Sequence, residues 1–446
     1  MYLTVILIII LIILFGLYYG IAEYFLNILH MFNIIKGIPG PKAFPIIGNA
    51  HLFIGDTTAL FKQILNRGKN YQLLWRVWIG AKLLVIVENP EYIKTVLKSP
   101  NIIDKSKEYE KMKPFLGNGL ITAPASLWDS HRKVLNKMFL MKNIKSYMDV
   151  FINHSIALME KLETFVGEEL DIFDYAFRCT LNIIYDATLD TQLNLLTNPD
   201  YILIESIKCA MDITTQRIFK LWLHPNIIFY NTARGKKFQA CLAYMDNVSN
   251  KIIKEKRESM LRSKINRQLT AEKLGQKQKT LLDFLLETSH EEEGYTEKDI
   301  RDEMNTILLA GSETTATTIS FVLLMLASFP EIQNKVYEEL NQIYCSDDPK
   351  SIPMTYDDIK SMKLLERVIK ETLRLFPAVP IIARKVTQDI KGQHFAMLET
   401  ATILATLIKR FRFIIDKSVE IAEIDVKLNI TLKPTKPIRL KFENRN

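Results

Sequence analysis

Residues 296–330 read TEKDIRDEMNTILLAGSETTATTISFVLLMLASFP, and this stretch decides the fold. It opens on Thr296-Glu297-Lys298-Asp299, a capping box in which a threonine and an acidic residue three positions later satisfy the first free amides of a helix. The apolar run that follows predicts one long helix to about Ser328, and Pro330 stops it because proline has no amide hydrogen to donate. Gly311, near the middle, costs about 1 kcal/mol relative to alanine, so it indicates either close packing or an opened groove.

A second motif follows at residues 371–377, ETLRLFP. Glu371 and Arg374 stand three residues apart on one helix, where an ion pair is usually a surface feature worth roughly 0.3 kcal/mol. The pair is more informative because a proline-containing run follows it directly and Arg384 lies a short distance beyond.

Trp128 and Arg132 form a third pattern, one helical turn apart. An indole and a guanidinium are suitable donors to a buried carboxylate, although this spacing alone is common.

Together, the Ala310-Gly311-Ser312-Glu313-Thr314-Thr315 segment and these two patterns resemble the cytochrome P450 superfamily, and the chain is most similar to insect-type family 4 microsomal enzymes. The resemblance extends to Phe442. It implies a mainly α fold, the cytochrome P450 fold of a large helical domain with small β-sheets, behind an N-terminal transmembrane helix. It also implies haem as the cofactor, an NADPH-cytochrome reductase as partner, and hydroxylation of an apolar substrate with O2. The implied substrates are a fatty acid, a lipid hormone or a xenobiotic.

The resemblance further implies roles for individual residues. Glu313 and Thr314 line the oxygen pocket in the matching positions and help to deliver protons, which O–O bond cleavage requires while bulk water is kept out. Trp128 and Arg132 match the contact with a haem propionate. The remaining cofactor-binding residues implied by the resemblance are Ala310, Gly311, Glu371, Arg374 and Arg384. Because Ala310 stands where many family 4 members carry a glutamate esterified to haem, covalent haem attachment is not expected.

In the family, the pair that matches Glu371 and Arg374 is buried and completed by a second arginine. No Pro-x-Arg-Phe segment follows Arg384 in this chain, so that arginine is absent. We therefore expect a buried pair that is short of one partner, which would destabilise the fold.

The cysteine that holds the iron in this family is also missing from the sequence. Gly392-Gln393-His394-Phe395-Ala396-Met397-Leu398-Glu399 resembles the helix that begins just after that cysteine, and counting back two residues places Ile390 at the ligand position. Only sixteen residues separate Arg374 from Lys391, where the family has a strand, a meander and the ligand loop. We expect an internal truncation near 391/392 and no metal ligand, because His394 follows the ligand position and points elsewhere on its helix.

Two alternatives to an active monooxygenase remain open. The chain is either a catalytically dead truncated isoform or gene-model product, or a membrane-anchored protein that binds apolar ligands or occupies the reductase as a decoy. The haem content of the purified chain distinguishes the enzyme from the decoy.

The N-terminal segment predicts a membrane anchor. Residues 3–22 carry no charged side chain, and twenty helical residues span about 30 Å, the thickness of the hydrocarbon layer. A cleaved signal peptide is disfavoured because a basic start and a cleavage site are missing. Lys36 and Lys42 follow the span, which predicts a single-pass protein of the endoplasmic reticulum membrane with its body in the cytoplasm. The expected domains are an anchor at 1–22, a juxtamembrane segment and proline-rich hinge at 23–49, and the catalytic domain at 50–446.

The distribution of charge argues against nucleic-acid binding, and the cysteine spacing argues for reduced thiols. The net charge of +8 is concentrated in residues 251–279, which hold ten Lys and Arg against three Glu. No aromatic residues alternate with these charges, so a solvated connection near an anionic membrane surface is favoured and nucleic acid is not expected as a partner. The four cysteines show no paired spacing, which is typical of reduced structural thiols.

Other segments give a coarse secondary structure. Residues 71–79 and 82–87 predict a hairpin across Gly80-Ala81, and Asn89-Pro90 predicts a helix start. Apolar residues recur at helical spacing in three later segments, 138–162, 201–219 and 238–256. Residues 426–432 and 438–442 alternate in polarity and suggest a short final hairpin.

Overall fold

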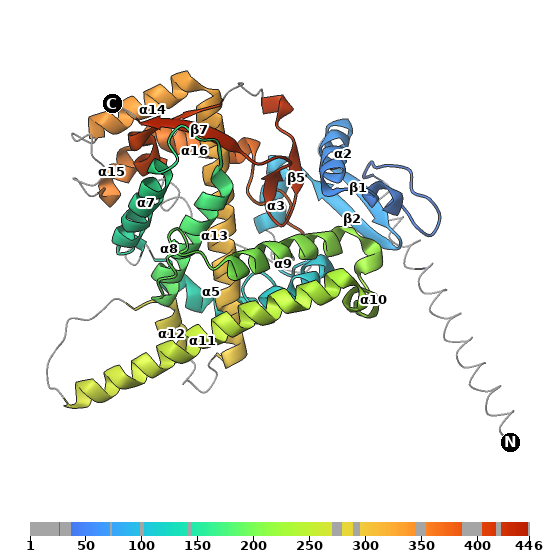
Figure 1. Cartoon of the computed structure of the whole chain (residues 1–446). Helices are drawn as coiled ribbons and strands as arrows, with labels where there is room; N and C mark the ends of the chain where they lie inside the picture. Colours follow the sequence, from blue (N-terminus) through green and yellow to red (C-terminus); the bar gives the residue numbers. More distant parts are fainter. Residues whose placement is uncertain are drawn as a thin grey trace. The chain divides into compact units, whose positions relative to one another are not determined.

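The computed structural model describes residues 26, 37–71, 74–98, 102–140, 144–269, 279–288, 295–343, 354–385, 404–415 and 421–444. These residues form two compact units that divide between Ser99 and Pro100 (Figure 1). The expected anchor at 3–22 lies outside the described residues, and so do Ile390, Gly392 and His394. The domain boundaries expected from the sequence therefore stay predictions.

The N-terminal unit is built around one hairpin. Strands β1 (Leu74–Ile79) and β2 (Lys82–Val87) pair antiparallel with Ile79 opposite Lys82, as the sequence predicts. Gly80 makes the turn at a φ of +59°, which glycine adopts at little cost. The side chain of Asn89 accepts a hydrogen bond of 3.0 Å from the Glu91 amide, which confirms the predicted helix start. The helices of this unit are η1 (Ala50–Phe53), α2 (Thr57–Asn70) and α3 (Pro90–Lys98).

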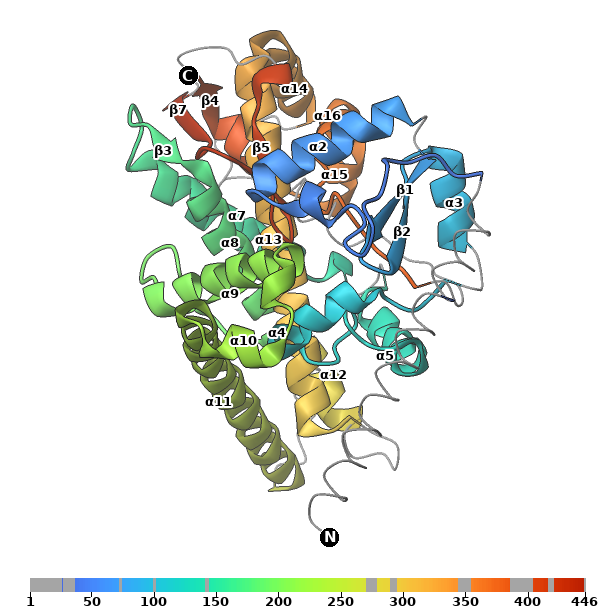
Figure 2. The same cartoon turned by 90° about the vertical axis from the view of Figure 1, so that its right-hand side faces the viewer.

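The C-terminal unit is mainly helical, which confirms the fold class, and α13 (Glu297–Ser328) runs through it (Figures 1 and 2). Thr296 caps α13 with the predicted capping box. Among the described residues, α13 alone is long and apolar enough to cross a membrane, but most of it is buried inside the protein. The other helices are η2 (Lys107–Lys111), α4 (Lys113–Leu116), α5 (Ala125–Met138), α7 (Met148–Glu163), α8 (Ile172–Leu189), α9 (Tyr201–Phe219), η3 (Leu221–Leu223), α10 (Asn226–Asn231), α11 (Ala233–Leu269), α12 (Leu281–Thr288), α14 (Pro330–Ile343), α15 (Tyr356–Ser361), α16 (Lys363–Leu375) and η4 (Ile421–Glu423).

The final hairpin forms with different partners from those predicted. β5 (Val426–Leu428) pairs with β6 (Leu432–Pro434), so the first of the two runs folds back on itself. β7 (Arg439–Asn444) instead lies between β3 (Leu170–Asp171) and β4 (Phe411–Ile414). The prediction was wrong because it ignored burial: the rings of Phe411, Phe413 and Phe442 pack together across β4 and β7 at centroid distances of 5.2–6.3 Å.

Candidate functional site

The segment from Ala310 to Thr315 lies in the buried middle of α13, against α8. A Cβ atom on Gly311 would lie 2.5 Å from Cδ1 of Ile184, so this glycine serves close helix packing rather than an open groove. The Thr180 hydroxyl donates 2.9 Å to the carbonyl of Ser312, which joins the two helices by a polar contact. The Thr314 hydroxyl donates 2.6 Å to the carbonyl of Ala310 and is therefore bonded within its own helix.

Glu313 is fully buried and is held by the C-terminal hairpin. Its Oε1 lies 2.6 Å from Nζ of Lys433 and accepts a 3.2 Å hydrogen bond from the Thr431 hydroxyl. Its Oε2 has no hydrogen-bond partner among the residues that the structure describes. The Lys433 ammonium also lies 4.7 Å from the ring centroid of Phe173. No local sequence pattern predicts this contact, because the two charges are about 120 residues apart.

Two cations meet where the chain after α16 returns toward α5. Lys105 and Arg384 form an isolated antiparallel bridge, and the Lys385 amide donates 2.7 Å to the Asp104 carbonyl. The Lys105 ammonium lies 5.8 Å from the ring centroid of Trp128. Burial, followed by the neighbouring Arg384 guanidinium, lowers the pKa of Lys105 from 10.5 to about 8. The structure thus brings two predicted site residues, Trp128 and Arg384, to one lysine that sequence reasoning missed.

This cluster is suited to an anion. Nε of Arg384 is buried and finds no hydrogen-bond partner within the described part of the chain. The neighbouring carboxylate of Asp104 accepts a 2.9 Å hydrogen bond from the Ala125 amide at the start of α5. Arg132 lies one turn beyond Trp128 on the same helix and is half-buried. A carboxylate at this place would gain charge-assisted hydrogen bonds and relieve the repulsion between the two cations.

We expect Lys105→Met to stabilise the fold at neutral pH. The folded-state pKa of Lys105 lies below its ordinary value, so the folded state binds fewer protons than the unfolded state between about pH 8 and 10.5. Its burial as a cation therefore costs stability below pH 8, about 1–3 kcal/mol, and this cost disappears as the pH rises to 10.5. Chemical unfolding at pH 7 and pH 10 measures the effect. Lys107→Met, at an exposed neighbour, is the control, and equal gains for both variants at pH 7 would contradict the assignment.

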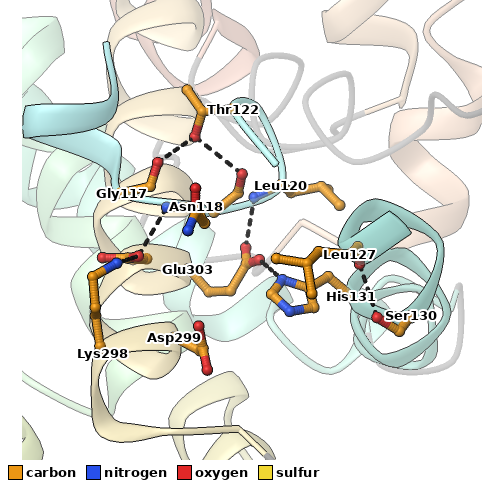
Figure 3. Close-up of polar contacts among 12 residues, drawn as sticks. Gly117, Asn118, Leu120, Thr122, Leu127, Ser130, His131, Lys298, Asp299 and Glu303 are labelled. Atoms are coloured by element: carbon orange, nitrogen blue, oxygen red, sulfur yellow. Dashed lines mark hydrogen bonds and ion pairs between the residues drawn. The ribbon is translucent and has the colours of Figure 1, made fainter. Parts of the chain in front are cut away.

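The position of α5 is fixed by a buried contact with α13 (Figure 3). Oε1 of Glu303 lies 2.7 Å from Nδ1 of His131, and its Oε2 accepts a 3.1 Å hydrogen bond from the Leu120 amide. The His131 ring lies 4.7 Å from the ring of Tyr295. Burial, and then the Glu303 carboxylate, raise the pKa of Tyr295. Because His131 directly precedes Arg132, this contact determines where α5 presents its predicted site residues.

Asp302, the residue before Glu303, binds the same loop at Asn118, two residues before Leu120. Its Oδ2 accepts 2.8 Å from the Asn118 amide and 2.7 Å from Nζ of Lys298. Gly117 allows this approach: its φ is +55°, and a Cβ atom there would lie 1.9 Å from Cγ of Asp302. The Thr122 hydroxyl closes the loop with a 2.7 Å bond to the Gly117 carbonyl (Figure 3).

The Glu371–Arg374 pair differs from the expectation. Both side chains are more than half exposed, and they form two parallel hydrogen bonds of 2.7 and 2.8 Å. The hydrogen bond from Arg374 lowers the pKa of Glu371, and the same bond raises the pKa of Arg374. The prediction of a buried pair short of a partner is therefore wrong, because solvent and the bidentate contact satisfy both groups.

A small apolar cavity of ≈ 10 Å³ lies among α4, α8, α9, α11 and α13, which is about the volume of one water molecule. Its lining includes Phe115, Leu203, Ile207, Met245 and Leu308. A ligand larger than a water molecule can enter only if the helices that line this cavity, α9 and α11 among them, move apart.

Comparison with known proteins identifies the fold. A model of the family "Cytochrome P450" matches residues 38–391, most of the chain. Cytochrome P450 4c3 of Drosophila melanogaster is 32% identical over 389 residues, which cover 83% of this chain and 72% of that protein. The chain belongs to the cytochrome P450 family. Cytochrome P450 4V2 of Homo sapiens is a second P450 relative, 30% identical over 367 residues, which cover 80% of this chain and 69% of that protein.

Family membership implies haem as the cofactor, monooxygenation as the general reaction and a reductase as the redox partner. The cationic cluster of Lys105 and Arg384 with Trp128 fits the carboxylates of haem, since the buried Arg384 Nε needs an acceptor. The residues present do not supply a matching ligand for the haem iron in the described part of the chain. The sequence has no cysteine after Cys345, and the described residues contain no group of three or more potential metal ligands. The P450 family match ends at residue 391, next to the predicted truncation.

Proposed function

We propose that this P450 fold serves haem-thiolate monooxygenation of an apolar substrate, with O2 and electrons from NADPH through a membrane reductase. We also propose that the activity requires a segment near 391/392 that carries the thiolate. A fatty acid, a lipid hormone or a xenobiotic is the proposed substrate class. The observation that carries the proposal is the buried Nε of Arg384, which has no hydrogen-bond partner among the described residues and lies beside the second cation, Lys105.

Each proposed role follows from a contact of this chain. Arg384, Lys105 and Trp128 would bind the haem carboxylates, with Arg132 one turn further along α5. Haem itself supplies oxygen activation when it is bound. Glu313 and Thr314 are proposed to hold and pass protons on α13, and the apolar lining of the nearby cavity favours an apolar substrate.

The proposed location is the endoplasmic reticulum membrane, with the catalytic body facing the cytoplasm. The uncharged segment at 3–22 and the lysines after it support this proposal, and they also suit membrane lipid as a partner.

Carbon monoxide difference spectra of the reduced, purified protein test the function. We expect no thiolate-type band from the chain with Ile390 at the ligand position, because an isoleucine side chain cannot bind iron. The same chain with a Phe-x-x-Gly-x-Arg-x-Cys loop restored should give the band, and its Cys-to-Ser control should not. A normal band from the unrestored chain would show that the ligand assignment is wrong. A restored chain that binds haem and gives no band would contradict the monooxygenase itself.

In the restored chain, we expect Thr314→Ala to lower the ratio of hydroxylated product to NADPH consumed, by about tenfold. The change removes a hydroxyl that can hold a proton-carrying water, while alanine keeps the helix stable. Peroxide release, measured beside NADPH consumption, should rise to balance the loss. Thr314→Ser retains the hydroxyl and serves as the matched control. An unchanged ratio in Thr314→Ala would refute the role of this residue.

A further inference from the structure

Two cysteines that are far apart in the sequence meet between α9 and α11. Helix α9 packs against α11 and lies beside the first part of this longer helix, as Figure 1 shows. Where α9 and α11 pack together, the side chains of Cys209 on α9 and Cys241 on α11 are interacting neighbours. Cys209 is partly exposed, whereas Cys241 is buried. Paired cysteines are recognised in a sequence by short spacings such as Cys-x-x-Cys, and these two are 32 residues apart (241 − 209).

Polar contacts hold both ends of α9. At the C-terminal end of α9, the buried Arg217 donates 3.2 Å to the Leu223 carbonyl, and its guanidinium lies 4.0 Å from the ring centroid of Phe229 in α10. At the other end, the Tyr244 hydroxyl of α11 donates 2.9 Å to Asp200, which caps α9. The hydrogen bond between Tyr244 and Asp200 joins α11 to the start of α9 directly and opposes sliding of one helix along the other.

We propose that Cys209 and Cys241 are an oxidation site that closes to an inter-helix disulfide. The oxidant is a hydroperoxide. The Cys209 thiolate attacks the peroxide oxygen, the O–O bond breaks, and the products are a sulfenic acid and the alcohol or water. The Cys241 thiol then displaces the hydroxyl, forming the S–S bond and releasing water. Two thiols are oxidised, and one peroxide is reduced by two electrons.

Cys209 is the attacking thiol because it is the more exposed of the two. Burial, and then the hydrogen bond with Cys241, raise the pKa of the Cys209 thiol to about 11. Two charged groups nearby act in opposite directions: Lys237 of α11 lowers this pKa and Asp212 of α9 raises it. The thiolate fraction is therefore small at pH 7, and the oxidation rate should increase roughly tenfold per pH unit up to pH 9.

The disulfide would act on the apolar cavity. Leu203 and Ile207 of α9 line it from the same helix as Cys209, and Met245 and Ser249 of α11 line it from the helix of Cys241. A covalent link between these helices restricts the opening that an apolar ligand needs. Oxidation would thus slow ligand entry without changing any residue that touches the ligand.

Peptide mapping of the full chain after treatment with hydrogen peroxide tests the proposal. We expect a protein about 2 Da lighter, with Cys209 and Cys241 in one disulfide-linked peptide pair that dithiothreitol separates. The melting temperature of the oxidised protein should rise by about 5 °C, because the link restricts the unfolded chain. The rate of linkage at pH 8 should be about ten times that at pH 7.

Cys209→Ser and Cys241→Ser should each abolish the linked pair. Cys179→Ser is the matched control, because Cys179 is fully buried and hydrogen bonds to the His154 carbonyl, so this variant should still link. Oxidation of Cys209 to sulfinic acid without linkage, or linkage to another cysteine, would overturn the proposal. The mapping of the unmutated chain decides the question even if a serine variant does not fold, and it needs no haem.

Discussion

Glu303→Ala will lower the free energy of unfolding by about 3–5 kcal/mol, a large part of the stability of a typical domain. The Glu303 side chain is fully buried and binds both the His131 ring and the Leu120 amide. Its removal leaves two buried donors without an acceptor, and each such group costs about 1–3 kcal/mol. Chemical unfolding with the full chain in detergent measures the loss.

Glu303→Gln separates the hydrogen bonds from the charge, since its amide oxygen can still accept one of the two bonds. We expect it to lose about half as much stability as Glu303→Ala. Glu258→Gln makes the same change in charge at a half-exposed site on α11, where Glu258 pairs with the exposed Arg262, so it should change stability by less than about 0.5 kcal/mol. Equal effects at the two sites would mean that the buried contact does not support α5.

Local patterns predicted the elements whose formation depends on nearby residues. The capping box at Thr296, the helix stop before Pro330 and the β1–β2 hairpin are confirmed. In these cases the residues that determine the structure lie within a few positions of one another. The family resemblance named Trp128 and Arg384 as site residues, but their common neighbour Lys105 was found only in the structure.

Contacts between distant segments could not be predicted in the same way. Neither the pairing of Cys209 with Cys241 nor that of Glu313 with Lys433 leaves a periodic pattern, because tertiary packing alone brings them together. The exposure of Glu371 was also missed, since the resemblance was assumed to carry the burial of the pair with it. One usable signal was overlooked: Glu303 is an acid within the apolar face of a core helix, and such a residue needs a buried partner.

Lys433→Met will lower the free energy of unfolding by about 3–5 kcal/mol, because it leaves the carboxylate of Glu313 buried with only the Thr431 hydroxyl as a partner. Glu313→Gln should cost less, since Lys433 remains partly exposed and keeps the ring of Phe173 beside it. The double variant should lie within about 1 kcal/mol of the unmutated chain, since neither charge is then buried alone.

The resulting double-mutant cycle gives a coupling energy that we expect to exceed about 2 kcal/mol. Lys133 and Asp129 are the control pair, because they meet at the same distance of 2.6 Å but are mostly exposed. Their coupling should stay below about 0.5 kcal/mol. If the Glu313–Lys433 cycle gave a value equally small, the hairpin would not hold the acid. A large value would mean that the β5–β6 hairpin holds the Glu313 side chain in place through Lys433. The C-terminal hairpin would then control the same acid that the proposed proton delivery uses.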